Sequence, residues 1–363
     1  FDVELDRLVG TLTVAEKQMV AICRALMFNA KLIIMDEPTT ALTKKEVRAL
    51  FDIILKLKAQ GIAILFVSHK LNEVFEISER FTIFRSGKLI VTGNTKDLDD
   101  KMFSYYMTGR EFDNKKFVPE YKGEGDVLEV KNLTLSGAFN DVSFKLRRGE
   151  ILGITGLLDS GRTELALSLF GIRKATSGTI LKDGKPVTIA SPRDAIQNGI
   201  GFVPEDRLSE GLFLPRSIAD NIVISEIDRL TGAMSVINRK QRKAEIDKWV
   251  QELSIATPNP ENACSTLSGG NQQRIVLAKW LACKPDILIL NGPTVGVDIG
   301  SKHDIHQILQ RLANQGMAVI IISDDLPEVL ENCSSLLVMK GGRIVASLDP
   351  ASTTENEVLG HMM

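Results

Sequence analysis

The chain has 363 residues, of which 44% are hydrophobic and 25% charged, a length and balance typical of a globular protein with two domains of ordinary size. Its net charge of −2 and pI near 6.2 give no electrostatic reason to expect nucleic acid as the main partner. The four cysteines lack C-x-x-C spacing, which argues against a zinc site or a disulfide framework and for a reducing cytosol, and apolar runs such as 318–322 are too short to span a bilayer.

The first strong motif is LIIMDEPT at residues 32–39, an apolar run that ends in two carboxylates. The composition predicts a strand followed by a turn that carries Asp36 and Glu37. Asp36 could hold Mg²⁺ through water, and Glu37 could polarise an attacking water molecule. A second predicted strand, AILFV at 63–67, is followed by His69, which could contact a transferred phosphate.

The middle of the chain separates two parts of different completeness. Residues 108–126 are polar, rich in Lys, Glu and Gly, and typical of a linker. We therefore expect a first domain at 1–112, a linker at 113–125 and a second domain at 126–363. Short β-rich runs without strict alternation are interspersed with helical stretches, which favours an α/β fold whose parallel sheet is covered on both faces.

A glycine-rich loop, GLLDSGRT at 156–163, joins an apolar strand to a predicted helix. This is the Walker A arrangement, in which glycines let backbone N–H groups approach phosphate oxygens at a helix N-terminus. Arg162 replaces the usual lysine and Asp159 puts a carboxylate into the loop, whereas Thr163 would ligate Mg²⁺. A glycine turn that only packs a helix on a strand remains the alternative. The candidate nucleotide-binding residues are Gly156, Ser160, Gly161, Arg162 and Thr163.

The motif TLSGGNQQRIVLAKWL, which starts at residue 266, places a serine and two glycines at the start of an apolar-periodic helix. Such a helix start offers free N–H groups to a phosphate, although an ordinary capped helix is the alternative. The candidate residues of this motif are Ser268, Gly269, Gly270, Asn271 and Gln272.

The chain repeats itself without a gap when it is shifted by 255 residues, so that the motif at 32–39 meets ILILNGPT at 287–294. At this shift Asn291 and Gly292 stand at the places of the two carboxylates, and Asp324 stands at the place of the histidine. The counterpart of the 156–163 loop would fall before the first residue of the sequence. We therefore expect the back part of one domain followed by the whole of a second.

Together these motifs resemble those of ATP-binding cassette (ABC) ATPases. The two fused cassettes, the loop GLLDSGRTE and the motif FVPEDR, with Glu205 near the usual glutamine position, are similar to the twin-cassette ATPases of bacterial monosaccharide importers of the ribose, galactose and xylose type. The resemblance implies a P-loop NTPase fold with a mixed sheet core and a helical subdomain. It also implies ATP and Mg²⁺ as cofactors, with Thr163 and Asp36 as metal-binding residues.

The resemblance further implies that ATP binds between two cassettes, each facing the signature motif of the other. The first cassette has good catalytic residues, Asp36, Glu37 and His69, but a poor signature. The second cassette has a good signature, but its catalytic positions are degenerate. Pairing across the interface therefore predicts one hydrolytic composite site and one degenerate site. The degenerate positions are Asn291, Gly292, Asp324, Asp159, Glu205, Val14 and Ala15.

The implied partners are transmembrane permease subunits, an extracytoplasmic sugar-binding protein acting indirectly, and a possible second copy of the ATPase chain, with no nucleic acid. The implied location is cytoplasmic and peripheral, on the inner face of the bacterial cell membrane. We expect this chain alone to be inactive or very weak as an ATPase. Two alternatives are a non-catalytic nucleotide-binding fragment and a ribosome-associated twin-cassette ATPase, although the latter would carry a long charged linker.

Overall fold

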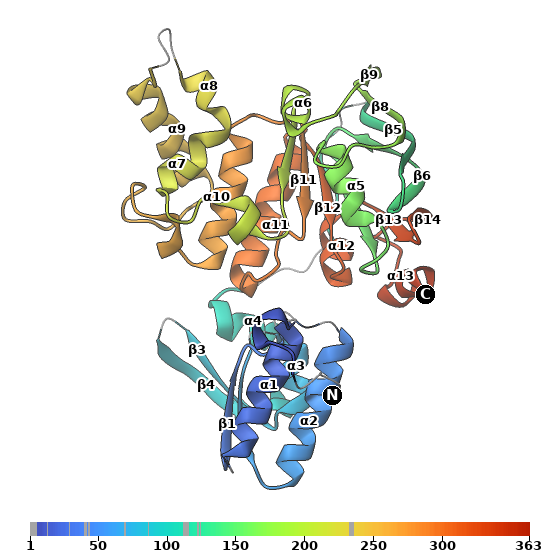
Figure 1. Cartoon of the computed structure of the whole chain (residues 1–363). Coiled ribbons are helices and arrows are strands. Elements are labelled where there is room, and N and C mark those ends of the chain that lie inside the picture. The colour runs from blue at the N-terminus through green and yellow to red at the C-terminus, as the bar shows by residue number, and fades with distance from the viewer. Residues whose placement is uncertain are drawn as a thin grey trace. The chain divides into compact units, whose positions relative to one another are not determined.

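Figure 1 shows the computed structural model, which describes residues 6–12, 14–28, 30–39, 42, 44–68, 70–85, 87–111, 116–121, 123, 125–231 and 236–363. Contacts along the chain divide it into two compact units, 1–112 and 113–363. His69 lies outside the described residues, as do the side chains of Val14 and Ala15. Over the described ranges, no helix is long and apolar enough to cross a membrane.

The first unit combines a parallel and an antiparallel strand pair with several helices. Its described elements are η1 (Val9–Thr11), α1 (Val14–Met27), β1 (Leu32–Asp36), α2 (Lys44–Ala59), β2 (Ala63–Val67), α3 (Leu71–Ile77), β3 (Arg80–Arg85), β4 (Lys88–Asn94), η2 (Thr95–Asp97) and α4 (Asp100–Thr108). Strands β1 and β2 run parallel, and β3 and β4 run antiparallel. Leu50, Ile54 and Leu57 form an apolar stripe on α2 and pack with Ile33 and Met35 in the core.

The opposite face of the β1–β2 pair is apolar and exposed. Leu32, Ile34, Leu65 and Val67 are 53%, 63%, 52% and 44% exposed. The corresponding residues of the second unit, Ile287, Ile289, Ile320 and Ile322, are at most 1% exposed. An uncovered apolar face of this kind is a surface on which further chain can pack.

The second unit is built on a six-stranded sheet. Its described elements are β5 (Asp126–Leu135), β6 (Phe139–Arg147), β7 (Ile151–Gly156), α5 (Arg162–Leu169), β8 (Ser177–Lys182), β9 (Lys185–Val187), α6 (Pro192–Gln197), β10 (Ile200–Val203), η3 (Arg207–Gly211), α7 (Ile218–Val223), η4 (Ile224–Glu226), α8 (Ile227–Leu230), α9 (Arg239–Glu252), η5 (Cys264–Thr266), α10 (Gly269–Leu281), β11 (Ile287–Asn291), α11 (Ile299–Asn314), β12 (Ala318–Ile322), α12 (Leu326–Asn332), β13 (Ser335–Lys340), β14 (Arg343–Leu348) and α13 (Glu355–Met362). The strand order is β10-β11-β12-β7-β13-β14, parallel except for β14, and a separate antiparallel sheet has the order β6-β5-β8-β9.

Both faces of the six-stranded sheet are covered, as the lack of alternation in its strands predicts. On one face, Leu288 and Leu290 pack with residues of α7 and α9–α12. On the other, Ile287 and Ile289 pack with α5 and the antiparallel sheet (Figure 1). The expected parallel core is therefore present, but the edge strand β14 and the second sheet make the fold mixed.

The internal repeat is preserved in three dimensions. Leu32 pairs with Ala63 across β1 and β2, and Ile287 pairs with Ala318 across β11 and β12, which is the same register 255 residues later. The helices α3 and α12 and the strands β4 and β14 also correspond at this shift. The two units therefore share a common framework for comparing their turns.

The described part of the expected linker packs against the second unit. The backbone N–H of Phe117 donates to the carbonyl of Glu331 at 2.8 Å, and that of Glu120 donates to Oδ1 of Asn314 at 3.0 Å. The ring of Tyr121 lies against Gly149, where a Cβ atom would come within 2.6 Å of it. Residues 116–121 thus belong structurally to the second unit, although their polar composition is typical of a free linker.

Candidate functional site

The glycine-rich loop occupies the turn between β7 and α5. Gly161 caps α5 with a φ of +87°, and a Cβ atom there would lie 2.6 Å from the carbonyl oxygen of Ala138. A Cβ atom at Gly156 would lie 2.5 Å from the carbonyl oxygen of Met339. Glycine is therefore required at both ends of the loop, once for backbone conformation and once for close packing.

The loop presents buried hydrogen-bond donors that no described residue satisfies. Arg162 is 7% exposed, and its Nε and Nη1 atoms and the hydroxyl of Ser160 have no hydrogen-bond partner in the described structure. Its Nη2 lies 3.8 Å from Oδ1 of Asp324. Buried cationic donors at a helix N-terminus fit a phosphate group. Thr163 is half-buried in the first turn of the helix, whereas Asp159 is exposed.

The turn after β11 lacks the carboxylates found at the corresponding turn of the first unit. Nδ2 of Asn291 lies 3.4 Å from Oε2 of Glu205, so a carboxylate from the segment after β10 contacts this strand end. Gly292 has a φ of +58°, and its N–H donates to the carbonyl of Ile322 at 2.8 Å. A neutral amide and a glycine supply neither a charged metal ligand nor a base.

The turn after β1 has the same backbone but a different side chain. Glu37 has a φ of +43°, in the left-handed region, and its N–H donates to the carbonyl of Val67 at 2.9 Å. Asp36, at the end of β1, is exposed. Left-handed backbone is costly for residues other than glycine and is concentrated at functional sites. The two turns therefore differ mainly in whether they carry a carboxylate.

A buried glutamate supports each of these turns, a feature that the sequence motifs did not reveal. In the first unit, Glu73 accepts hydrogen bonds from Thr39 at 2.5 Å and Ser68 at 2.7 Å. The only sequence signal was the recurrence of the same three residue types 255 residues later. This network ties the carboxylate turn to the segment that precedes His69.

In the second unit, Glu328 takes the equivalent position and accepts from Thr294 and Ser323. Burial alone raises the pKa of Glu328, but the nearby charges of His306 and Lys302 and the hydrogen bonds outweigh burial and lower the pKa to about 2. Nε2 of His306 lies 3.0 Å from the carboxylate. The turn at 292–294 thus keeps its support although it has lost its carboxylates.

The signature motif lies at the start of α10. Ser268 is the N-cap residue, but its hydroxyl caps no helix N–H and instead accepts from Nδ2 of Asn271 at 3.0 Å. The first N–H groups of a 13-residue helix are therefore left without a side-chain cap, which suits a phosphate ligand. A Cβ atom at Gly270 would lie 2.0 Å from Oγ of Ser301. Gln272 is buried, so packing rather than ligand contact explains this position.

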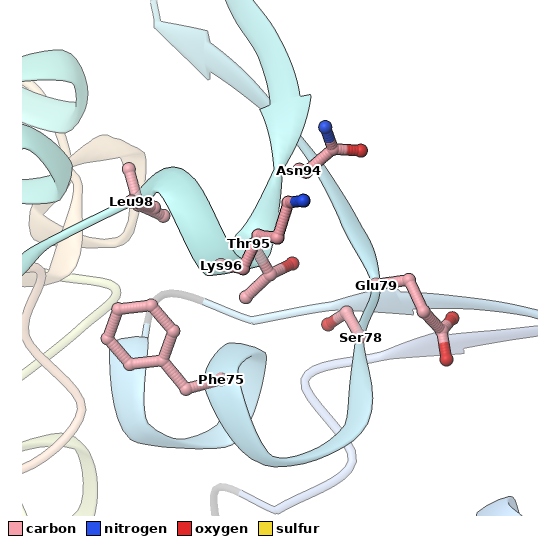
Figure 2. Close-up of a pocket in the computed structure, with 7 residues that line it drawn as sticks. All are labelled: Phe75, Ser78, Glu79, Asn94, Thr95, Lys96 and Leu98. Atoms are coloured by element: carbon pink, nitrogen blue, oxygen red, sulfur yellow. The ribbon is translucent and has the colours of Figure 1, made fainter.

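A separate pocket of about 580 Å³ lies in the first unit, between α3 and η2 (Figure 2). Its lining residues are Phe75, Ser78, Glu79, Asn94, Thr95, Lys96 and Leu98, none of which belongs to the predicted motifs. At the corresponding place in the second unit, Nζ of Lys116 donates to the carbonyls of Pro350 and Ala351. Chain segment 116–117 therefore occupies the place that is open in the first unit.

Among the described residues, no group of three or more His, Cys, Asp or Glu side chains is arranged to hold a metal ion. Thr163 and Asp36, the residues predicted to hold Mg²⁺, belong to different units. Thr163 lies in the first turn after the glycine-rich loop, Asp36 ends β1, and each offers an oxygen ligand of the type that Mg²⁺ prefers.

Residues 139–295 match the ABC transporter family. The ribose import ATP-binding protein RbsA of Clostridium perfringens (strain 13) is 42% identical over 358 residues, which cover 99% of this chain and 72% of that protein. The chain belongs to the ABC transporter family. A putative ribose/galactose/methyl galactoside import ATP-binding protein of Halalkalibacterium halodurans is 41% identical over 351 residues, which cover 97% of this ABC transporter chain and 67% of that protein.

A solved nucleotide-free ATP-binding cassette from an ABC transporter superimposes with a TM-score of 0.56 and 22% identity, covering 66% of this chain and 95% of that chain. This likeness supports the cassette fold. The predicted resemblance to ABC ATPases and the predicted α/β cassette fold are thus confirmed.

Proposed function

We propose that this chain is the ATP-binding subunit of an importer for monosaccharides and that its two units supply complementary parts of composite ATP sites. The observation that carries this proposal is the pair of equivalent turns, with Glu37 in one and Gly292 in the other. The same backbone and the same buried support are kept in both units, but only the first has the carboxylates. The sugar-import names of the relatives supply the substrate class.

In the hydrolytic site, Glu37 would polarise the attacking water, with His69 beside it. The uncapped start of α10, at Ser268 and the two glycines after it, would hold the phosphates from the opposite side. A positioned general base contributes roughly 10²–10⁴-fold in rate. Mg²⁺, when bound through Asp36, would neutralise charge on the phosphates.

In the second site, the loop at 156–163 would hold nucleotide without hydrolysing it. The backbone N–H groups, Ser160 and Arg162 provide phosphate contacts, and Thr163 provides an oxygen for Mg²⁺. Gly292 provides no base, and the signature that would face this loop has Val14 and Ala15 in place of glycines. Binding without turnover is the expected behaviour of this site.

The exposed apolar face of β1 and β2 supports this division. Hydrolysis beside Glu37 requires a phosphate loop. In the second unit that loop joins β7, a strand of the six-stranded sheet, to α5, which packs on the matching face. We therefore propose that residues 1–363 alone hydrolyse almost no ATP and that a strand, loop and helix of the β7–α5 kind, packed on the first unit, complete the active site.

For the partner, we propose two membrane permease chains that place this subunit at the cytoplasmic face of the membrane, with an extracytoplasmic sugar-binding protein acting through them. Phe213, Leu208 and Ile224, in the segment after Glu205, are 57%, 47% and 42% exposed. Leu214, the next residue after Phe213, packs against the core instead. Exposed large apolar residues in one segment suit contact with another chain.

The test begins with fluorescent-ATP binding to the chain and to Arg162→Ala. The second step is phosphate release by a protein in which a complete first cassette precedes residue 113. We expect binding that Arg162→Ala weakens, and turnover only in the completed protein. Uptake assays with the permease and a panel of monosaccharides then identify the sugar. Failure to bind ATP, or fast turnover by residues 1–363 alone, would contradict the proposal.

A further inference from the structure

Arg207 links two motif-bearing segments of the second unit. It is the first residue of η3, a short π-helix that follows β10. Its Nη1 donates to the carbonyl of Val295 at 2.7 Å, and its Nη2 donates to the carbonyl of Gly296 at 2.9 Å. Both carbonyls lie in the turn between β11 and α11. A planar guanidinium can hold two successive carbonyls in this way, whereas a lysine ammonium is a single point charge.

The same guanidinium lies against the signature motif. A Cβ atom at Gly269 would lie 2.8 Å from Nη2 of Arg207 and 3.1 Å from the carbonyl oxygen of Gly296. Gly269 is the first residue of α10, so the start of the signature helix rests on the Arg207–Gly296 hydrogen bond. A shift of Arg207 or of the Gly296 carbonyl would therefore displace the start of α10, which carries the signature motif.

The Arg207 guanidinium donates its hydrogen bonds to these two carbonyls and not to the neighbouring carboxylate of Asp206. The carboxylate of Asp206 accepts from the backbone of Leu208 and Ser209 and from the Ser209 hydroxyl. Burial lowers the pKa of Arg207, and its buried Nε has no hydrogen-bond partner among the described residues. A partly desolvated cation of this kind is costly to detach from its carbonyl partners.

At its other end, the Arg207 segment begins beside the degenerate nucleotide site. Glu205 stands two residues earlier and contacts Asn291 at the end of β11. A Cβ atom at Gly292 would lie 3.2 Å from Cγ of Glu205 and 2.9 Å from Cγ2 of Val295. The strand end, Glu205 and the 295–296 turn are therefore packed as one group.

We propose that Arg207 is a positioning residue that couples nucleotide occupancy of the loop at 156–163 to the placement of the signature at 268–270. This inference rests on the proposed function, in which these two motifs serve different ATP sites. A shift of the β11 end against Glu205 moves the carbonyls of Val295 and Gly296, and the guanidinium carries the start of α10 with them. The non-hydrolytic site thereby adjusts the hydrolytic one.

The test is hydrogen–deuterium exchange of the full chain with and without ATP, read in peptides that cover 264–275 and 292–298. Arg207→Met removes the charge, Arg207→Lys keeps it without the fork, and Arg239→Met, at an exposed arginine of α9, is the control. In the unsubstituted chain and the control, we expect ATP to slow exchange in both peptides. In both Arg207 variants, we expect this response to be lost in 264–275 while the ATP dissociation constant stays close to that of the unsubstituted chain.

A purely structural role would raise exchange in the absence of ATP and leave the ATP-induced difference intact, which would overturn the proposal. An equal ATP response in the unsubstituted chain and Arg207→Lys would also overturn it, even if Arg207→Met failed to fold. If the unsubstituted chain bound no ATP, the proposed function itself would fail, a result that the dissociation constant separates from a loss of coupling.

Discussion

Thr294 donates a hydrogen bond to the buried carboxylate of Glu328 at 2.6 Å, although the two residues lie 34 positions apart in the chain. The same bond joins Thr39 to Glu73 at 2.5 Å in the first unit. In each case it anchors the turn after one strand, β1 or β11, to the helix after the next parallel strand. The two units differ in the basic side chain beside this carboxylate, which is His306 in the second unit and Lys70 in the first.

This relationship predicts an effect of Glu328→Gln on stability. The amide keeps the shape of the side chain but loses the charge that faces His306. We expect the free energy of unfolding of the second unit to fall by about 1–3 kcal/mol at pH 7, because hydrogen bonds to a buried charged group are lost. Chemical denaturation measures the change, with the exposed Glu357→Gln as control. An equal change in both variants would contradict the role of the network.

The difference in unfolding free energy between the unsubstituted chain and Glu328→Gln should depend on pH, and the pKa of Glu328 fixes the direction. The folded-state pKa of Glu328 is about 2, below its ordinary value of 4.5, so the unfolded chain takes up the proton first as the pH falls. The stability from this group is therefore complete above about pH 4.5 and is lost as the pH falls towards about 2. Denaturation of both proteins across this window should show their difference shrinking, and a difference that grew would refute the assignment.

The left-handed backbone at positions 37 and 292 should make glycine more stable than alanine at both positions. At position 37, Gly should give a more stable first unit than Ala by about 1 kcal/mol, since both remove the carboxylate but only Gly relieves the backbone strain. Gly292→Ala should destabilise the second unit by at least a similar amount, because its Cβ would also come within 2.9 Å of Val295. Thermal unfolding of the three variants tests this, and equal stability of the position-37 pair would argue against a strained glutamate.

Removing the negative charge of Asp324 should increase the affinity of the 156–163 loop for ATP. Its carboxylate lies 3.8 Å from the guanidinium of Arg162, where it competes with phosphate for the positive charge. Because Asp324 is exposed, we expect Asp324→Asn to tighten ATP binding by only roughly two- to five-fold. The exposed Asp247→Asn is the control, and fluorescent-ATP titration at low and high salt is the measurement. Weaker binding by Asp324→Asn would mean that the carboxylate helps to hold the ligand.

The hydrolytic site predicts a large loss of turnover in the completed protein described under the proposed function. Glu37→Gln should lower steady-state phosphate release by about 10²–10⁴-fold, as expected for a lost general base. Ser268→Ala should cost less, because the helix N–H groups remain. Arg162→Ala should mainly weaken nucleotide retention, so equal losses from the changes at 37 and 162 would count against the division into two sites.

Much of the framework could be predicted from the sequence. The motifs at 32–39 and 287–294 begin with the equivalent strands β1 and β11, and their shift of 255 residues is kept in the strand register. The glycine loop and the signature motif are local patterns, so their turn and helix start follow from nearby residues. These features need no information about distant parts of the chain.

The support of the site could not be predicted, because it depends on contacts between distant segments. In the sequence, Glu73 and Glu328 look like ordinary helix residues. Only the folded structure shows that they bind Thr39 and Thr294. Arg207 looks like one charge in a polar run, since the carbonyls that it binds are 88 and 89 residues away. Residues 116–121 have the composition of a linker, and only their packing assigns them to the second unit.

The pocket in Figure 2 is a difference in surface shape between the two repeats, separate from the differences in their catalytic residues. In the first unit, Phe75 and Leu98 line an open hollow, whereas in the second unit Lys116 and Phe117 lie at the matching place. A small molecule selected for this hollow would therefore address one repeat and spare the other. The phosphate loop at 156–163 belongs to the second unit, so ligands of the hollow and ligands of that loop would act on different repeats.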